Sequence, residues 1–547
     1  MQTFNPYLPS WEYIPDGEPY VFNGRAYVYG SHDRFNSRAY CMNDYVTWSA
    51  PVDSADNAGG IGPWRYEGII YRAKQDPRAD KDSLLFAPDL QQGADGRFYL
   101  YYALHNRPVM GIAVADSPAG PFEYYGVVEY PDGVAVGEAP NRKEDFSNFD
   151  PGVLVDDDGK VYLYSGFAPR KTARALSVEE AGYEKNHLGA YCMELEADMM
   201  TVKRGPFLVF PRAGDDRGAL GKGYRGHEFF EASSLRKVKL PGWESAKYYF
   251  IYSSINSHEL CYALSDKPDG GFVYGGVIIS NGDVRPDKNN PEIDINVHGI
   301  KMDDTEASAY MGNNHGSMAE INGSWYIFYH RQTNLHQYSR QDCAEPITIN
   351  NDGSIEQVEM TSCGLNTDKD GKPSPLNGWG TYEARIACNL FMPGTVMWFP
   401  FDHRLEPGNI PYITQDAPDY TPPVPSTSGE GRLGGTTTDL PNTPQQYIAN
   451  FQNDAVAGFK YFMVDNAAHP LKTLTMRIRG KARGTVFVSG SLKTEPFAKL
   501  AIDVDSGNDA SAWKDCAAAC AIPEGKTALF FTFQGEGAFD WLSFTLS

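Results

Sequence analysis

The 547-residue chain lacks the features that mark several large classes of protein. No stretch approaches the 18 consecutive apolar residues of a membrane-spanning helix, and the opening MQTFNPYLPSW has neither the basic nor the apolar region of a secretion signal. The eight cysteines are dispersed without a CxxC pair, which fits reduced thiols. We therefore expect a cytoplasmic protein with no membrane partner, or a secreted one if a leader has been removed.

Basic residues are also scarce, because 48 lysines and arginines stand against 70 acidic residues and give a net charge of −22. Nucleic-acid binding requires a basic face that neutralises phosphates, so we expect no nucleic-acid partner. The acidity either serves solubility or places some carboxylates around a neutral polar substrate or a cation.

Aromatic residues are abundant, with 34 tyrosines and 29 phenylalanines, and 54 glycines and 37 prolines are spread along the whole length. Aromatic residues favour strands, and glycine and proline favour turns. This composition predicts an all-β protein with many turns.

A short aromatic strand recurs five times in the first two thirds of the chain. Each copy is a polar turn followed by alternating aromatic or β-branched residues, as in NGRAYVYGS and DGKVYLYSG. The anchor tyrosines of the five copies are Tyr27, Tyr99, Tyr162, Tyr249 and Tyr326, at spacings of 72, 63, 87 and 77 residues. Repeated units too thin to hold their own core predict a five-bladed β-propeller. The alternative is a large β-sandwich with coincidental hairpins.

A titratable residue precedes each anchor at the head of the first strand of its unit. These residues are Asp16, Asp89, Asp150, Glu231 and His315, placed 11, 10, 12, 18 and 11 residues before their anchors. The innermost strands of a propeller run along its axis, so we expect the five side chains to converge at one end of it. Taken singly, each of them also fits an ordinary capping or turn residue.

Converging carboxylates have two main uses. They bind a hard cation through oxygen, or they act as acid and base across a glycosidic bond. Crowding and partial burial move their pKa values apart, which supplies one protonated and one ionised group. Carboxylates on opposite sides of an axis fit the separation of roughly 6.5–9.5 Å that inverting enzymes use.

The ordered motifs PDGEP, APD, FDPGVLVDDDGKVYLYSG, FEASSLRK and NNHGSMAEINGSWYIFYH resemble glycoside hydrolase family 43 over roughly residues 5–400. The resemblance implies a five-bladed propeller that hydrolyses α-L-arabinofuranosides or β-D-xylosides with inversion. It implies that Asp16 is the general base, Glu231 the general acid and Asp150 the group that orients the acid and keeps its pKa high. It also implies that His315 lies beside a bound calcium or its waters, and that Arg340 contacts the sugar.

Departures from the family motifs leave rivals for two of these roles. The first motif reads PDGEP in place of Ala-Asp-Pro, so Glu18 is a rival of Asp16. The acid motif reads Glu-Ala-Ser in place of Glu-Gly-Pro, and Glu228 is a rival of Glu231.

Four further residues are candidates for binding the substrate. We expect Asp89 to contact the sugar, and His32 and Asp33 either to line the pocket or to form a turn at a strand end. Phe35 either stacks on a sugar ring or closes a blade. No cofactor is required for the chemistry; a structural calcium near the propeller axis is the single cofactor that we consider.

The C-terminal part has a different composition. Residues 421–445 are rich in proline, serine, threonine and glycine and predict a long loop, after which short alternating strands such as LTMRIRG predict a β-sandwich with jelly-roll character. The closing stretch resembles carbohydrate-binding module family 6. Trp513 is either a sugar platform or a packing residue. We place the catalytic propeller at residues 1–404 and the module at 405–547.

The first hypothesis for function is therefore an inverting, exo-acting α-L-arabinofuranosidase that acts on side chains or oligosaccharides from plant polysaccharides. The alternatives within the class are a β-D-xylosidase and an endo-acting xylanase or arabinanase. The alternative from another class is a non-catalytic sugar-binding propeller.

Overall fold

The computed structural model describes residues 2–52, 60–105, 107–139, 141–168, 189–211, 223–285, 307–399, 404–408, 410–417, 443–507 and 512–547. Within these residues the chain is almost wholly β, with helical turns such as Ala73–Gln75 and Ala384–Ile386, and none of its helices has the length and apolar character needed to cross a membrane. The predicted loop falls on residues 421–442, outside this described part, and on 443–445 at its edge.

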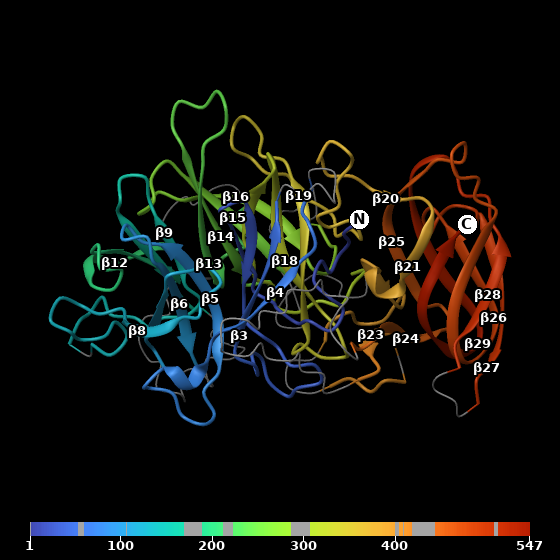
Figure 1. The fold of residues 1–547 in the computed structure, drawn as a ribbon, viewed down its shortest axis with the longest axis horizontal. Coiled ribbons are helices and arrows are strands. Elements are labelled where there is room, and N and C mark those ends of the chain that lie inside the picture. The colour runs from blue at the N-terminus through green and yellow to red at the C-terminus, as the bar shows by residue number, and fades with distance from the viewer. Residues whose placement is uncertain are drawn as a thin grey trace.

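Five antiparallel sheets follow one another along the chain and form the blades of a propeller, blue to yellow in Figure 1. Their strands are, for the first blade, β1 (Glu18–Phe22), β2 (Arg25–Tyr29), β3 (Tyr45–Pro51) and β4 (Arg65–Tyr71); for the second, β5 (Leu85–Gln92), β6 (Phe98–Leu104), β7 (Met110–Ala115) and β8 (Glu123–Val127); for the third, β9 (Gly152–Val155), β10 (Val161–Ser165), β11 (Gly189–Leu195) and β12 (Val202–Pro211); for the fourth, β13 (Phe229–Val238), β14 (Lys247–Ser254), β15 (Glu259–Ser265) and β16 (Val273–Ser280); and for the fifth, β17 (Met318–Ile321), β18 (Ser324–Gln332) and β19 (Arg340–Ile347).

The five-bladed all-β architecture is confirmed, and the anchor tyrosines all lie on the second strand of their blades. Among the described residues the fifth blade has three strands where the others have four. The Asn5 side chain donates to the Ala344 carbonyl at 2.9 Å and accepts from its N–H at 3.0 Å. The N-terminal segment therefore covers the free edge of β19, which is otherwise open to pairing with another chain.

Neighbouring innermost strands are joined close to the axis all the way round the ring. The contacts are Tyr20 to Asp89 (2.6 Å), Val153 to Asp89 (2.6 Å), Ala232 to Asp150 (3.1 Å), Ser234 to Ser317 (2.7 Å) and a parallel bridge between Gly17 and Gly316. The last contact needs glycine, because a Cβ on Gly316 would lie 2.0 Å from the Phe328 carbonyl oxygen. These contacts bring the heads of the five blades together.

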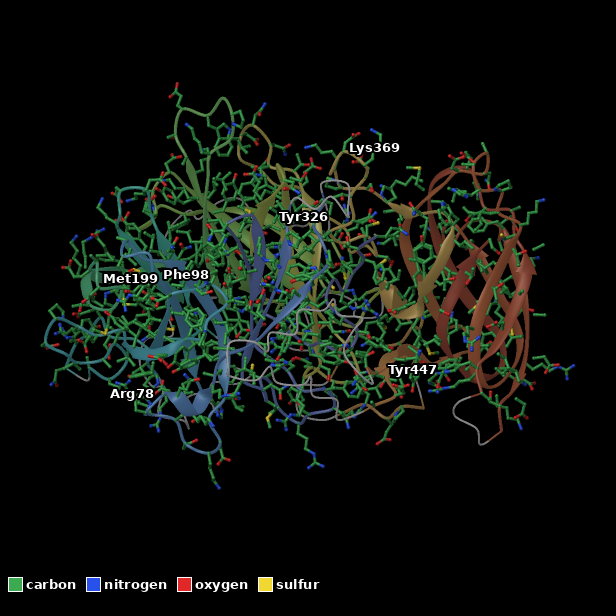
Figure 2. All side chains as sticks on the ribbon, in the orientation of Figure 1. Arg78, Phe98, Met199, Tyr326, Lys369 and Tyr447 are labelled. Atoms are coloured by element: carbon green, nitrogen blue, oxygen red, sulfur yellow. The ribbon has the colours of Figure 1, made fainter. Side chains whose placement is uncertain are left out.

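A separate apolar core fills each gap between neighbouring blades. Trp48, for example, is fully buried between the fifth and first blades, and Phe250 is fully buried between the third and fourth. Figure 2 shows Phe98 and Tyr326 among the packed side chains of the propeller and Lys369 at its rim. Truncating a residue such as Trp48 to alanine should cost about 3–5 kcal/mol of stability.

The C-terminal strands form one curled ten-stranded sheet around its own core, orange to red in Figure 1. Its strands are β20 (Leu376–Asn377), β21 (Gly380–Glu383), β22 (Asn389–Phe391), β23 (Tyr412–Gln415), β24 (Gln446–Gln452), β25 (Val456–Val464), β26 (Thr473–Ser489), β27 (Ala498–Asp505), β28 (Lys514–Ala519) and β29 (Gly525–Leu546). The sandwich-like second unit is thus present. The boundary at 404/405 stays a prediction, but β20, β21 and β22 precede it and already pair with β25 and β29.

Candidate active site

The three predicted catalytic carboxylates lie where the chain enters its blades. Asp16 and Asp150 each stand two residues before their innermost strands and have φ values of 61° and 46°. Glu231 is the third residue of β13 and is followed by Ala232 at φ 67°. Left-handed backbone costs on the order of 1–3 kcal/mol at a non-glycine residue and persists only where surrounding structure holds it, which is common at functional sites.

His315 brings two of these carboxylates to one point. Its Nδ1 lies 3.9 Å from Asp16 Oδ1 and 3.6 Å from Asp150 Oδ2. Asp150 Oδ2 also accepts the N–H of Ala232, next to Glu231, at 3.1 Å. Charge on Glu231 is one of the influences that raise the pKa of Asp150, so Glu231 belongs to the same group. The structure thus assembles Asp16, Asp150, Glu231 and His315 from four blades.

Asp16 is held in its ionised form by basic and polar neighbours. Burial alone would raise its pKa, but the guanidinium of Arg340, with Nη1 at 2.9 Å from Oδ1, holds the pKa below its ordinary value. The Asp16 N–H donates to Nδ1 of His330 at 3.2 Å, while His330 Nε2 donates to the Asn313 carbonyl at 2.6 Å. Burial lowers the pKa of His330 to about 3, so this imidazole is neutral with its proton on Nε2.

Arg340 is itself fixed by Asp33. Its Nε lies 2.9 Å from Asp33 Oδ2 and its Nη2 lies 3.1 Å from Asp33 Oδ1. This bidentate ion pair fixes both the distance and the orientation of the guanidinium. The guanidinium also lies 4.6 Å from the ring centre of Tyr40. Asp33 therefore orients Arg340, and Arg340 in turn contacts Asp16.

The carboxyls of Asp150 and Glu231 influence each other electrostatically. Asp150 is buried, and that burial, followed by the charges of Glu231 and Asp16, raises its pKa well above the ordinary value. Two neighbouring carboxyls release their protons in steps that belong to the pair. The pair therefore retains a proton at a pH where Asp16 is ionised, which supplies an acid and a base in one site.

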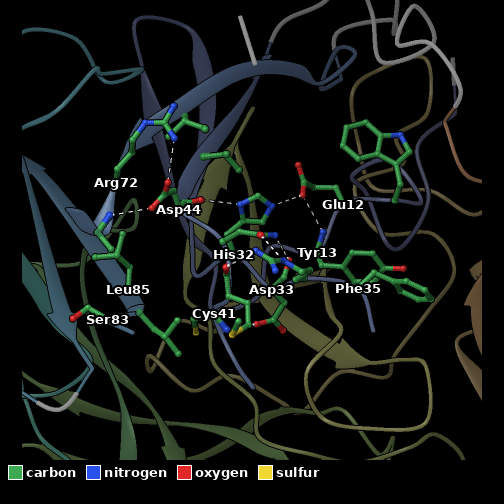
Figure 3. A pocket seen from close by; sticks show the side chains of 18 of the residues that line it. Glu12, Tyr13, His32, Asp33, Phe35, Cys41, Asp44, Arg72, Ser83 and Leu85 are labelled. Carbon is green, nitrogen blue, oxygen red and sulfur yellow. Dashed lines mark hydrogen bonds and ion pairs between the residues drawn. The ribbon is translucent and has the colours of Figure 1, made fainter. Parts of the chain in front are cut away.

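The predicted pocket residues His32, Asp33 and Phe35 line one cavity of about 600 Å³, whose lining does not include Asp16, Asp150 or Glu231 (Figure 3). His32 is held by Glu12 Oε1 at 3.0 Å and by the Asp44 carbonyl at 2.8 Å, as the dashed lines in Figure 3 show. Phe35 packs against Tyr13, with ring centres 5.6 Å apart. Asp33 connects this cavity to the carboxylates through Arg340.

Asp89 and the rival Glu18 lie in a different polar cluster on the inner strands. Asp89 is fully buried and accepts from Tyr20 and from the N–H groups of Leu90 and Val153. Glu18 is also fully buried and is paired with Arg236. These contacts favour a role in joining the blades over contact with a sugar.

The second rival, Glu228, forms a hydrogen bond within its own loop. Its Oε2 accepts the N–H of Gly226 at 3.0 Å. Glu231 stands three residues further on, beside Asp150. This arrangement favours Glu231 over Glu228 as the acid.

The surroundings of His315 fit an ordered water better than a directly bound calcium. His315 Nε2 is buried and has no hydrogen-bond partner among the described residues, and burial lowers its pKa to about 4, so the ring is a neutral acceptor or donor. Calcium prefers oxygen ligands, and the oxygen of Asp16 nearest to His315 is already paired with Arg340. A calcium held through waters near His315 stays a prediction.

His330 is a site residue that the repeat did not single out. It lies four residues after the anchor Tyr326, where the other blades have Ser31, Ala103, Gly166 and Ser253. A histidine at a position that is small in every other blade was a usable signal.

Trp513 contacts a cation in the C-terminal sheet. The guanidinium carbon of Arg479 lies 4.3 Å from the ring centre of Trp513 and 4.5 Å from that of Tyr447. The two rings are 5.7 Å apart and nearly perpendicular. This contact favours packing over sugar stacking at Trp513.

Comparison with known proteins gives consistent relatives. The pattern described as "Glycosyl hydrolases family 43" matches residues 57–355, more than half of the chain. A "Xylosidase/arabinosidase" of Thermoclostridium stercorarium is 44% identical over 546 residues, which cover 100% of this chain and 99% of that protein. A "Xylosidase/arabinosidase" of Bacteroides ovatus is 27% identical over 69% of this chain and 99% of its own length. "Xylosidase/arabinosidase 43A" of Humicola insolens is 29% identical over 66% of this chain and 95% of its own length.

Proposed function

The chain belongs to glycosyl hydrolases family 43, and on this basis we propose that it is an exo-acting α-L-arabinofuranosidase that works by inversion. Its substrate is a side chain or oligosaccharide derived from xylan or arabinan. A single displacement by water accounts for the roles given to the three carboxylates.

In this reaction Asp16 removes a proton from a water molecule whose oxygen attacks the anomeric carbon. The bond from that carbon to the leaving oxygen breaks, and Glu231 donates its proton to the leaving oxygen. Asp150 orients the acid. Its carboxylate oxygen accepts the N–H of Ala232 and so fixes the backbone next to Glu231, and its carboxyl interacts electrostatically with that of Glu231. The ionised state of Asp16 and the proton kept by the Asp150–Glu231 pair support this division of roles.

One observation carries the proposal: carboxylates from the first and third blades face the same His315 nitrogen, and the acid from the fourth blade adjoins them. Four buried or half-buried titratable groups at the meeting point of separate blades are costly unless they act on a shared ligand. A purely structural role would not require one ionised and one protonated carboxyl side by side.

A β-D-xylosidase is the second candidate for the sugar. The 44% identical relative of equal length is named for both activities, as are the two more distant relatives. Terminal arabinofuranose and xylopyranose are both pentoses with three free hydroxyls, so one pocket is able to accept either.

Two assays test the proposal. Release of 4-nitrophenol from the α-L-arabinofuranoside and from the β-D-xyloside identifies the preferred sugar; cleavage of the xyloside alone would reject the first candidate.

Glu231→Gln and Asp16→Asn should each lower kcat by roughly a thousandfold or more. Glu228→Gln, three residues from the acid, is the matched control and should keep activity within about threefold. Unchanged activity in both catalytic variants would refute the roles given to Glu231 and Asp16, whereas no hydrolysis of either glycoside by the unchanged protein would leave a sugar-binding propeller as the function.

A further inference from the structure

The chain that carries Glu231 enters its blade irregularly. The pairing of β13 with β14 shifts register on both sides of Glu231, between Phe229 and Glu231 and again between Glu231 and Ser234. A bulged ladder leaves residues without their regular backbone partners and re-aims the side chain. The ladder is irregular on both sides of the acid, so contacts outside it help to hold this segment; the carbonyls of Glu228 and Phe230, for example, accept the N–H groups of Ile255 and Ala168.

His227 lies four residues before Glu231 and is fixed on three sides. Its Nδ1 is 2.5 Å from Glu259 Oε1, its ring stacks on Tyr274 with centres 5.4 Å apart at 12°, and its carbonyl accepts the Tyr252 hydroxyl at 2.7 Å. The side chain is almost completely buried. His227 thus anchors the loop before β13 to the strands β14, β15 and β16.

Glu259, the partner of His227, gathers donors from the turn between β14 and β15. Its Oε1 also accepts from Ser254 Oγ at 2.5 Å and from Asn256 Nδ2 at 2.9 Å. Burial alone would raise the pKa of Glu259, but His227 and these hydrogen bonds lower it to about 2, so the carboxylate stays ionised. One buried charge therefore ties together the loop before the acid and the turn beside it.

The same residues, with Cys261, form a group whose atoms are near enough to surround a metal ion. The contacts favour a hydrogen-bonded anchor instead. The 2.5 Å between His227 Nδ1 and Glu259 Oε1 is a hydrogen-bond distance, and Oε1 already accepts from several donors, while Cys261 Sγ lies 3.8 Å from it. A metal would have to displace this network.

We propose that His227 and Glu259 are positioning residues for the general acid Glu231: the pair clamps the irregular chain before β13 and holds the acid against the leaving oxygen. This inference rests on the proposed function, because it takes Glu231 as the acid. Both residues are almost completely buried, so in this proposal they act through the chain that carries the acid and not on the sugar.

Proton donation matters most when the leaving group is a poor one, and this gives the test. We would measure kcat/KM for a series of glycosides of the preferred pentose, from 2,4-dinitrophenyl through phenyl to methyl, in Glu259→Ala and in the unchanged protein. Glu259→Ala should slow the methyl glycoside by roughly a hundredfold and the dinitrophenyl glycoside by less than about threefold. Glu259→Gln keeps an acceptor oxygen for His227 and should restore most of the loss.

Glu345→Ala is the matched control. Glu345 is an equally buried glutamate that holds Asn5 and Thr361 in the fifth blade, so its loss should lower the melting temperature without any dependence on the leaving group. Should Glu259→Ala not fold, His227→Gln removes the same clamp from the other side and should give the same dependence.

Two outcomes are decisive and separable. Equal slowing of all leaving groups in Glu259→Ala and His227→Gln, while Glu231→Gln shows the steep dependence, overturns the positioning role alone. An absence of dependence in Glu231→Gln refutes the acid assignment and with it the proposed function.

Discussion

The ionisation of Asp16 should depend on Arg340, and replacing Arg340 with glutamine tests this directly. In the structure Arg340 Nη1 lies 2.9 Å from Asp16 Oδ1, and both side chains are almost completely buried. Burial is the largest influence on the pKa of Asp16 and acts to raise it; the Arg340 charge is the largest influence against it. Without Arg340 the effect of burial should prevail.

The size of the change follows from this balance. An adjacent arginine lowers the pKa of an aspartate by about 1–3 pH units, each worth about 1.4 kcal/mol. The general base must be ionised, so kcat/KM falls on the acid side as pH drops through the pKa of Asp16 in the free enzyme. Arg340→Gln should therefore move this acid limb upward by about 2 pH units, and activity at pH 5 should fall far more than activity at pH 7.

The assay is the pH dependence of kcat/KM for the 4-nitrophenyl glycoside that the enzyme prefers. Arg340→Gln also strands the buried Asp33 carboxylate, which is strongly destabilising, so the double variant with Asp33→Asn should be measured beside it. Arg331→Gln is the control, because Arg331 is also a buried arginine. Its recorded hydrogen bonds go to the backbone carbonyls of Ala387 and Arg385. An acid limb that stays in place in the folded double variant would refute the electrostatic account of Asp16.

Three further predictions concern the pair of acids, the stereochemistry and the second sheet. Asp150→Asn leaves Glu231 without the second carboxyl of the pair, and so without the like-charge repulsion that delays loss of the last proton; the alkaline limb of kcat/KM should therefore move to lower pH by about one unit or more, and an unmoved limb would contradict the shared proton. Proton NMR of the first product should show the inverted anomer, and the retained anomer would exclude attack by water in a single step. Trp513→Ala should leave binding to arabinoxylan in an affinity gel unchanged, because Arg479 already lies against the Trp513 ring; a clear loss of retention would show that the ring binds sugar.

The propeller was predictable because its cause is local and repeated. Each anchor such as Tyr162 follows a polar turn, and alternating residues must bury one face, so five copies predict five sheets that have to pack on one another. The start of the C-terminal sheet was harder to predict. Strands β20 and β22 have two and three residues, too few to show an alternating pattern, and they are stabilised by pairing with β25.

The contacts of Arg340 show a second limit on prediction. A family motif places an arginine near the site, but its orientation depends on Asp33, which is 307 positions away in sequence. His330 is similar, since its tautomer is set by the Asp16 N–H on one side and the Asn313 carbonyl on the other. Partners that only folding brings together leave no spacing in the sequence to read.

The titratable residues of the five repeats also differ in how far along the innermost strand they lie, and this position decides their role. Asp16 and Asp89 precede their anchors by 11 and 10 residues, yet Asp16 lies two residues before β1 while Asp89 is the fifth residue of β5. Asp89 Oδ2 accepts the N–H of Val153, three residues after Asp150, so at about 3.3 Å per strand residue Asp89 lies about 10 Å further along the inner strands than Asp150. It meets the neighbouring strands β1 and β9 there, and its oxygens join blades.

Glu231 shows how a residue inside a strand still belongs to the site. It is the third residue of β13, but the register shifts around it and the left-handed Ala232 interrupt the regular pleat at this position. The backbone N–H of Ala232 is thereby free to donate to Asp150 and not to the ladder. The bulge therefore brings the acid beside its partner, and a regular strand of the same sequence length would carry it past the site.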